Sequence, residues 1–167
     1  GSSGQIGSSF CKLFLDLGAF VYGFDKGSNK LKHKNYVYKK TDITKKNIVE
    51  NNIKSLVKNK KRIDIIINNA GFSVFTKFYN RTDNELNNTI NVNIKGTLNM
   101  INSYFKIHKL MKLKKCNIIN IGSIYGSMSP DFRVYGKNSN YNSEIYGATK
   151  ASVIQLTKYY SVILSPF

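Results

Sequence analysis

Short apolar runs alternate with segments of helical periodicity along this chain, and this alternation limits the fold more than any other feature. Residues 19–24, 36–39, 63–67 and 116–121 are rich in the β-branched and aromatic side chains that strands favour. Strands that alternate with helices form βαβ units around a parallel sheet. We therefore predict one α/β domain over residues 1–167. Because the run at residues 63–67 is apolar on both faces, we expect these strands at central positions of the sheet.

Helices are predicted in the segments between and after the strands. The first carries an apolar stripe that stops before Gly18, namely Phe10, Leu13, Phe14 and Leu17. The second follows Thr44 as its cap and carries the stripe Val49, Ile53, Leu56 and Val57. Thr82 and Glu85 have the spacing of a capping box, which predicts a third helix through residue 90. Two more are predicted at residues 94–111 and 148–164, with a long functional loop at 126–143 before the last.

The formal net charge of +17 at pH 7 would suit a nucleic acid or an anionic membrane. Composition offers another cause, because Lys, Asn and Ile supply 63 of the 167 residues, a bias that A/T-rich coding DNA produces without selection for binding. Only 3 residues are Arg, which bidentate contacts to phosphates and bases favour. We therefore expect no nucleic-acid partner, and a basic nucleic-acid-binding domain is the weakest of three functional hypotheses.

The two cysteines, Cys11 and Cys116, lack the spacing of a metal site and are too few for a disulfide scaffold. They fit a reducing compartment, so we expect a cytoplasmic protein without a metal. The longest stretch free of charge, residues 116–130, is too short to span a bilayer, and we expect no membrane-spanning segment.

The opening of the chain has glycines at every third position, Gly1, Gly4 and Gly7, directly before a predicted helix. Such glycines let the backbone approach a pyrophosphate and aim helix amides at it. The alternative is a cloning linker, because Gly-Ser-Ser-Gly is common in expression vectors. Asp25 closes the first predicted strand. A carboxylate at this place accepts hydrogen bonds from both ribose hydroxyls of an adenosine and repels a 2′-phosphate. This favours NAD, with NADP as the alternative because Lys26 is adjacent.

Tyr146 and Lys150 stand four residues apart, on one face of the last predicted helix. A cation beside a phenol makes it a usable acid or base near neutrality. The pattern is weak alone, because Tyr22/Lys26 and Tyr36/Lys40 match it too. The run Asn68-Asn69-Ala70-Gly71 is far less expected by chance, and it follows the most apolar strand directly.

Together these motifs resemble those of the short-chain dehydrogenase/reductases. They are the glycine-rich opening, Asp25, Thr41-Asp42-Ile43, Asn68-Asn69-Ala70-Gly71, Asn93 with its neighbours, Ser123 and the Tyr146/Lys150 pair, in family order over the whole chain. The resemblance implies a Rossmann-like doubly wound parallel sheet. It also implies an NAD(P)-dependent oxidoreductase that transfers hydride between a nicotinamide and the carbonyl or alcohol of a small molecule.

The resemblance also assigns roles to individual residues. Tyr146 would be the acid/base, Lys150 would activate it and hold the nicotinamide ribose, Ser123 would polarise the substrate oxygen, and Asn93 would support a proton-relay water. The implied cofactor contacts are Gly1, Gly4, Gln5, Ile6, Gly7, Asp25, Asp42, Ile43, Asn69, Ala70 and Gly71, besides Tyr146 and Lys150.

Two features depart from the common family pattern. Gln5 stands where single-domain members usually carry a glycine, and Ser123 and Tyr146 are 23 residues apart. The family commonly has about a dozen residues there. The longer segment, which includes Pro130 and Asp131, is similar to that of bacterial oxidoreductases of flagellin or surface-glycan modification. It suggests a sugar or sugar-nucleotide substrate.

Both ends of the chain differ from the family as well. Members begin with a strand before the first glycine, which lies between the strands that here end at Asp25 and Asn68, and they continue beyond the Tyr/Lys helix. The resemblance therefore implies an incomplete sheet, without its first strand and its C-terminal strands, in a chain truncated at both ends. The alternative function is a non-catalytic remnant or a binding module. Family members pair helices between subunits, so the full-length protein would be a dimer or tetramer.

Overall fold

Two pairs of parallel strands carry the fold. The computed structural model describes residues 1–60, 62–135 and 141–167. β1 (Val21–Asp25) pairs with β2 (Tyr36–Lys40), and β3 (Ile65–Asn68) pairs with β4 (Asn117–Asn120). All four predicted strands are confirmed, with ends that shift by at most two residues.

The prediction of central positions for these strands is wrong. Over the described ranges the sheet consists of two separate two-stranded pieces, β1-β2 and β3-β4. Among the described residues, β1 and β3 each have one strand partner, and residues of both strands line one cavity. The α/β class and the parallel sense are confirmed, and the sheet is incomplete as expected.

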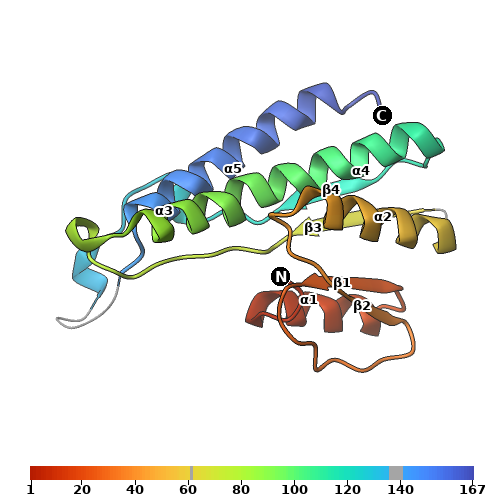
Figure 1. The fold of residues 1–167 in the computed structure, drawn as a ribbon, viewed down its shortest axis with the longest axis horizontal. Coiled ribbons are helices and arrows are strands. Elements are labelled where there is room, and N and C mark those ends of the chain that lie inside the picture. The colour runs from red at the N-terminus through yellow and green to blue at the C-terminus, as the bar shows by residue number, and fades with distance from the viewer. Residues whose placement is uncertain (61, 136–140) are drawn as a thin grey trace.

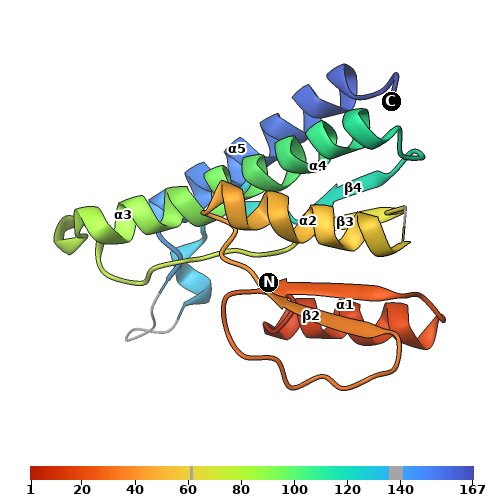
Figure 2. The same cartoon turned by 45° about the vertical axis from the view of Figure 1, so that its right-hand side comes forward.

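Five α-helices alternate with the strands in the described part of the chain. They are α1 (Gln5–Asp16), α2 (Lys46–Lys60), α3 (Asp83–Ile90), α4 (Thr97–Met111) and α5 (Glu144–Ile163). Short 3₁₀ turns lie at η1 (Phe78–Asn80), η3 (Ile124–Gly126) and η4 (Phe132–Val134), and the π-helix η2 (Asn91–Gly96) joins α3 to α4. Figures 1 and 2 show α1, β1 and β2 together on one side of the molecule and the remaining helices and strands on the other.

Local signals explain most helix boundaries. The Thr82 capping box is confirmed, with Glu85 N bonded to Thr82 Oγ1 and Thr82 N bonded to the Glu85 carboxylate. α5 begins four residues earlier than predicted, because Ser143 caps it by accepting from Tyr146 N. The predicted cap at Thr44 is wrong, because α2 begins at Lys46, and the Thr44 hydroxyl donates to Asp42 Oδ1. Part of the loop predicted at 126–143 lies outside the described residues.

The predicted apolar stripe of α1 is wrong in part. Leu13 and Leu17 are 53% and 73% exposed, and the buried positions are Gly7, Cys11 and Leu15. The helix packs against β1, and its buried face carries Gly7, Cys11 and Leu15. The stripe predicted for α2 is confirmed, because all four of its residues are buried.

A buried apolar cluster joins α2, β3 and α4. Its members are Val49, Ile53, Leu56, Val57, Ile66, Tyr104 and Ile107. Burying such side chains supplies the main driving force for folding. The cluster fixes β3 against two helices and so positions the segment that follows β3. No helix among the residues described is both long and apolar enough to cross a membrane.

Candidate active site

The glycine-rich opening forms a tight turn that leads directly into α1. Gly4 is the N-cap of the helix, no side chain caps it, and its first turn contains no acidic residue. A Cβ on Gly7 would lie 1.9 Å from Gly1 O, so only glycine permits this close approach. Gln5 and Ile6 are exposed beside the turn. The structure therefore offers helix amides to an anion, as a dinucleotide site requires.

Asp25 closes β1 beside this turn. Its carboxylate accepts hydrogen bonds from Ser3 N at 3.0 Å and from Gly27 N at 2.8 Å. Partial burial acts to raise the pKa of Asp25, but the bonds from Gly27 and Ser3 and the nearby Gly1 nitrogen outweigh it, so the pKa lies below its ordinary value. The carboxylate stays ionised and holds the glycine turn against the end of β1.

Asp42 and Ile43 follow β2, as predicted. Asp42 Oδ1 accepts from the amide of Thr44 at 2.9 Å and from its hydroxyl at 2.7 Å. Burial acts to raise the pKa of Asp42, yet these two bonds bring it below the ordinary value. Ile43 contacts the start of α4, since a Cβ on Gly96 would lie 2.4 Å from Ile43 Cδ1.

The run Asn68-Asn69-Ala70-Gly71 connects the glycine turn to the catalytic candidates. Asn68 Nδ2 donates to Asn120 Oδ1 at 2.8 Å, which joins the ends of β3 and β4. Asn69 Nδ2 donates to Gly1 O at 3.0 Å, and a Cβ on Gly1 would lie 2.7 Å from Ala70 Cα. These contacts brace the glycine turn, which is a structural task that the sequence did not reveal for Asn69.

Asn93 lies in the π-helix and is 1% exposed. Its Oδ1 accepts from Phe72 N at 2.7 Å, and its Nδ2 donates to Phe72 O and to Thr149 Oγ1, both at 2.9 Å. π-Helical turns inside α-helices frequently occur at functional sites. Here the amide clamps the segment after β3 to helix α5.

Tyr146 and Lys150 lie on α5, one turn apart. Lys150 is 5% exposed, and its Nζ lies 5.7 Å from the centre of the Tyr146 ring. The ammonium donates to Ile121 O at 2.7 Å. Burial lowers the pKa of Lys150, because an ammonium loses its hydration there. A Cβ on Gly71 would lie 3.7 Å from Lys150 Nζ and 3.8 Å from Asn93 Oδ1, so these three predicted residues meet at one point.

Ser123 follows β4 and caps η3, with its hydroxyl accepting from Tyr125 N at 3.2 Å. Two glycines allow the backbones of η3 and α5 to pack in direct contact. A Cβ on Gly126 would lie 2.8 Å from the Lys150 carbonyl carbon, and a Cβ on Gly147 would lie 2.8 Å from Tyr125 O. Ser123 and the Tyr146/Lys150 pair are therefore carried by segments in backbone contact.

Several residues that hold this site were not predicted. Thr149 Oγ1 accepts from Asn93 and donates to Tyr146 O at 2.8 Å. Arg81 forms a bidentate bond with Glu144 in the first turn of α5, at 2.8 and 3.0 Å. No local sequence signal could have found Arg81 and Glu144, which are 63 residues apart. Within the described ranges, no group of three His, Cys, Asp or Glu side chains could hold a metal ion.

Comparison with known proteins matches this chain to a protein family. The short chain dehydrogenase family profile matches residues 1–166. The chain is similar to the dehydrogenase/reductase SDR family member 6 of Xenopus laevis, with 32% identity over 157 residues that cover 92% of this chain and 58% of that protein.

Solved structures agree with this match. The short-chain dehydrogenase of Leptospira borgpetersenii with bound NAD⁺ superposes with a TM-score of 0.90 and 36% identity, over 99% of this chain and 64% of that one. The ligand-free aldohexose dehydrogenase of Thermoplasma acidophilum has a TM-score of 0.78 and 26% identity, over 97% of this chain and 58% of that one. The chain thus spans about three fifths of the length of such relatives. With the fold, the motif order and the profile in agreement, the chain belongs to the short-chain dehydrogenase family.

Proposed function

We propose that this chain is the cofactor-binding and catalytic part of an NAD(P)-dependent oxidoreductase. One observation supports the proposal most, namely the meeting of Gly71, Asn93 and Lys150 beside Tyr146, where the segments that follow β3 and β4 lie against α5. Open α/β sheets bind their ligands outside the carboxyl ends of the strands, which is where these residues lie.

The residues present fit a nicotinamide dinucleotide. The pyrophosphate would lie on the uncapped amino end of α1, held by Gly1, Gly4, Gln5, Ile6 and Gly7. Asp25 would accept hydrogen bonds from the hydroxyls of the adenosine ribose. Asp42 and Ile43 would lie at the adenine, and Asn69, Ala70 and Gly71 would form the wall toward the nicotinamide. An ionised Asp25 favours NAD over NADP, because it repels a 2′-phosphate.

The chemistry divides between cofactor and protein. When bound, the nicotinamide supplies or accepts a hydride at the substrate carbon. Tyr146 would exchange a proton with the substrate oxygen, and Ser123 would donate a hydrogen bond to that oxygen. Lys150, held 2.7 Å from Ile121 O, would stabilise the phenolate form of Tyr146 and bind the nicotinamide ribose. Asn93 would support the water through which this proton exchanges with solvent.

The proposed substrate is a small carbonyl compound or alcohol. More specifically, we propose a sugar or a sugar nucleotide. The segment between Ser123 and Ser143 contains a cluster of aromatic side chains. Phe132 and Tyr141 pack edge to face with their ring centres 4.8 Å apart, and the hydroxyls of Tyr125 and Tyr135 share a hydrogen bond. Aromatic faces of this kind suit the apolar faces of sugar rings. The similarity to an aldohexose dehydrogenase points the same way, and relation to flagellin or surface-glycan modification remains part of this proposal.

The proposal also covers the cellular location and the oligomeric state of the protein. We propose a cytoplasmic enzyme that forms a dimer or tetramer when full length, and the two free thiols, Cys11 and Cys116, are consistent with a reducing compartment. A non-catalytic remnant or binding module is the competing hypothesis, and the chain spans about three fifths of the length of its relatives.

Turnover in the presence of NADH tests the function. The protein is offered aldehydes, ketones and aldoses, and NADH oxidation is followed by absorbance. We expect Tyr146→Phe to lower kcat by about 100-fold or more without weakening NADH binding. The control is Tyr159→Phe, which changes an exposed tyrosine on the same helix. Full turnover by Tyr146→Phe would refute the role of Tyr146, and NADH binding without turnover in the wild type would favour the remnant.

A further inference from the structure

The loop between β2 and α2 is held in place by side chains of two helices. This β2–α2 loop covers residues 41–45 and carries Asp42 and Ile43, the residues proposed to lie at the adenine. Its first residue, Thr41, is buried, and the Thr41 amide donates to Asp25 O at 2.7 Å. The loop therefore starts at the strand end that carries the proposed ribose ligand.

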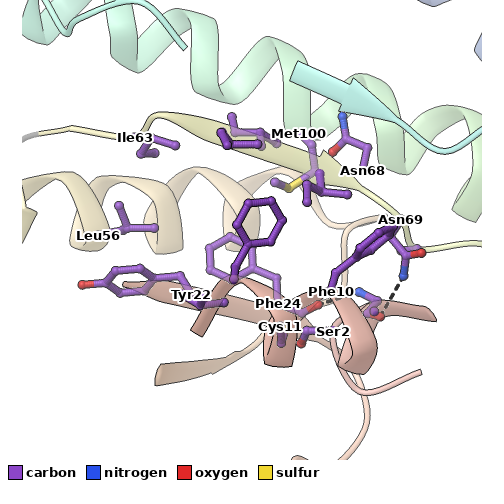
Figure 3. A pocket seen from close by; sticks show the side chains of 18 of the residues that line it. Ser2, Phe10, Cys11, Tyr22, Phe24, Leu56, Ile63, Asn68, Asn69 and Met100 are labelled. Carbon is purple, nitrogen blue, oxygen red and sulfur yellow. Dashed lines mark hydrogen bonds between the residues drawn. The ribbon is translucent and has the colours of Figure 1, made fainter. Parts of the chain in front are cut away.

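Asn99 of α4 binds the centre of this loop. Its Nδ2 donates to Ile43 O at 2.8 Å, and the residue is only 8% exposed. The Ile43 side chain contacts the same helical region, since a Cβ on Gly96 would lie 2.4 Å from Ile43 Cδ1. Figure 3 shows the next residue, Met100, with its side chain in the cavity that residues of β1 and β3 line. The helix thus fixes both the carbonyl and the side chain of Ile43.

The start of the loop is held from α2 instead. Asn52 Nδ2 donates to Thr41 Oγ1 at 2.9 Å, and Thr41 Oγ1 donates to Lys39 O at 2.9 Å. The bonds from Thr44 to Asp42 stay within the loop, so they shape the turn without attaching it to another element. Among the hydrogen bonds of the described residues, that of Asn99 is the one that joins this loop to α4.

The helix that carries Asn99 also carries Asn93. η2 (Asn91–Gly96) continues directly into α4 (Thr97–Met111), so the two asparagines lie on one continuous helix. Six positions separate them, which corresponds to about 9 Å along a helix axis. Asn93 is bonded to Phe72 and Thr149 beside the Tyr146/Lys150 pair. One helix therefore connects the catalytic candidates with the loop proposed at the adenine.

We propose that Asn99 is a positioning residue for the dinucleotide, which holds the β2–α2 loop where Asp42 and Ile43 contact the adenine. The inference rests on the proposed function, and it adds a residue that acts through Ile43 without touching the cofactor. Without the Asn99 donor, Ile43 O would have to find water as its partner, and the loop would leave its place more easily. The loss would fall on the adenosine half of the cofactor.

Separate titrations with the two halves of the dinucleotide test the proposal. Adenosine monophosphate and nicotinamide mononucleotide are added to the wild type and to Asn99→Leu, and binding is followed by NMR. We expect Asn99→Leu to weaken the binding of adenosine monophosphate by about 5-fold and to leave that of nicotinamide mononucleotide unchanged. The matched control is Asn102→Leu, which also removes an amide of α4, but one bonded to Tyr160 of α5. It should change neither affinity.

Asn99→Asp keeps the size of the side chain and provides a second measurement if Asn99→Leu fails to fold. A carboxylate cannot donate to Ile43 O, whereas a protonated carboxyl group can. The affinity for adenosine monophosphate, relative to the wild type at the same pH, should therefore recover as the pH falls from about 8 to about 5.

Two results would overturn the inference alone. One is an unchanged affinity for adenosine monophosphate in Asn99→Leu, or no recovery in Asn99→Asp at low pH. The other is an equal loss for both half-dinucleotides, which would show that Asn99 supports the fold as a whole. A wild type that binds neither adenosine monophosphate nor NAD would instead overturn the proposed function, and the inference with it.

Discussion

Asn93 Nδ2 donates a hydrogen bond of 2.9 Å to Thr149 Oγ1, and this buried contact joins the π-helix to the helix that carries Tyr146 and Lys150. Thr149 in turn donates to Tyr146 O. A single hydroxyl thus links the segment after β3 to the first turns of α5. The position of the phenol depends on this link as well as on its own helix.

Thr149→Val tests the contribution of that hydroxyl. The substitution keeps the shape of the side chain but leaves a buried amide donor without this acceptor, which should lower the free energy of unfolding by about 1–3 kcal/mol. Thr149→Ser retains the hydroxyl and should cost less. Urea unfolding of the three proteins measures the difference, and equal loss in the Val and Ser variants would show that the bond contributes nothing.

Gly126→Ala tests the contact of η3 with α5. The new Cβ would lie 2.8 Å from the Lys150 carbonyl carbon and 2.9 Å from Ala151 N, both of which are backbone atoms with little freedom to move. We expect a loss of about 1–3 kcal/mol in the free energy of unfolding. Gly122→Ala is the control, because its Cβ would meet only Ile154 Cγ1, at 3.8 Å. Equal stabilities of the two variants would contradict the close packing described.

The Arg81–Glu144 pair should make stability depend on pH. The hydrogen bond from Arg81 lowers the pKa of Glu144 below its ordinary value of 4.5. Because the folded pKa is depressed, the stabilisation is present above pH 4.5 and is lost as the pH falls through the folded value. Glu144→Gln should cost about 1 kcal/mol at neutral pH, since solvent screens the half-exposed carboxylate, and nothing in acid. A difference that persists unchanged in acid would exclude the ion pair as its source.

Asp25→Asn tests the preference between the two dinucleotides. The variant keeps the size of the side chain but removes the charge that would repel a 2′-phosphate, so NADP should gain relative to NAD. Titration calorimetry gives both dissociation constants. The neighbouring Lys26 stays in place as an internal control, and Lys26→Gln should shift the ratio in the opposite direction. An unchanged ratio in Asp25→Asn would show that Asp25 does not contact the ribose.

The strands and the site motifs could be predicted because their signals are local. The β-branched run at residues 63–67 predicts β3, and the capping box of Thr82 predicts the start of α3 to the residue. The π-helix at residues 91–96 could not be predicted, because nothing in these residues marks the extra residue per turn, and we expected a break between residues 90 and 94. Leu13 and Leu17 were misplaced because their exposure depends on what α1 packs against. The bond between Arg81 and Glu144 joins segments whose proximity only the fold creates.

The binding of NAD to ¹⁵N-labelled residues 1–167, followed by NMR, tests the central claim most directly. We predict saturable shifts at the amides of Gly4 to Gly7 and at Gly71, with smaller ones at Ile121 and Lys150. The affinity should be in the millimolar range, because β1, which ends at Asp25, and β3, which leads to Gly71, belong to separate two-stranded sheets in the described part of the chain. Saturable shifts confined to other residues, or none at saturating NAD, would contradict the assignment of this surface as a dinucleotide site.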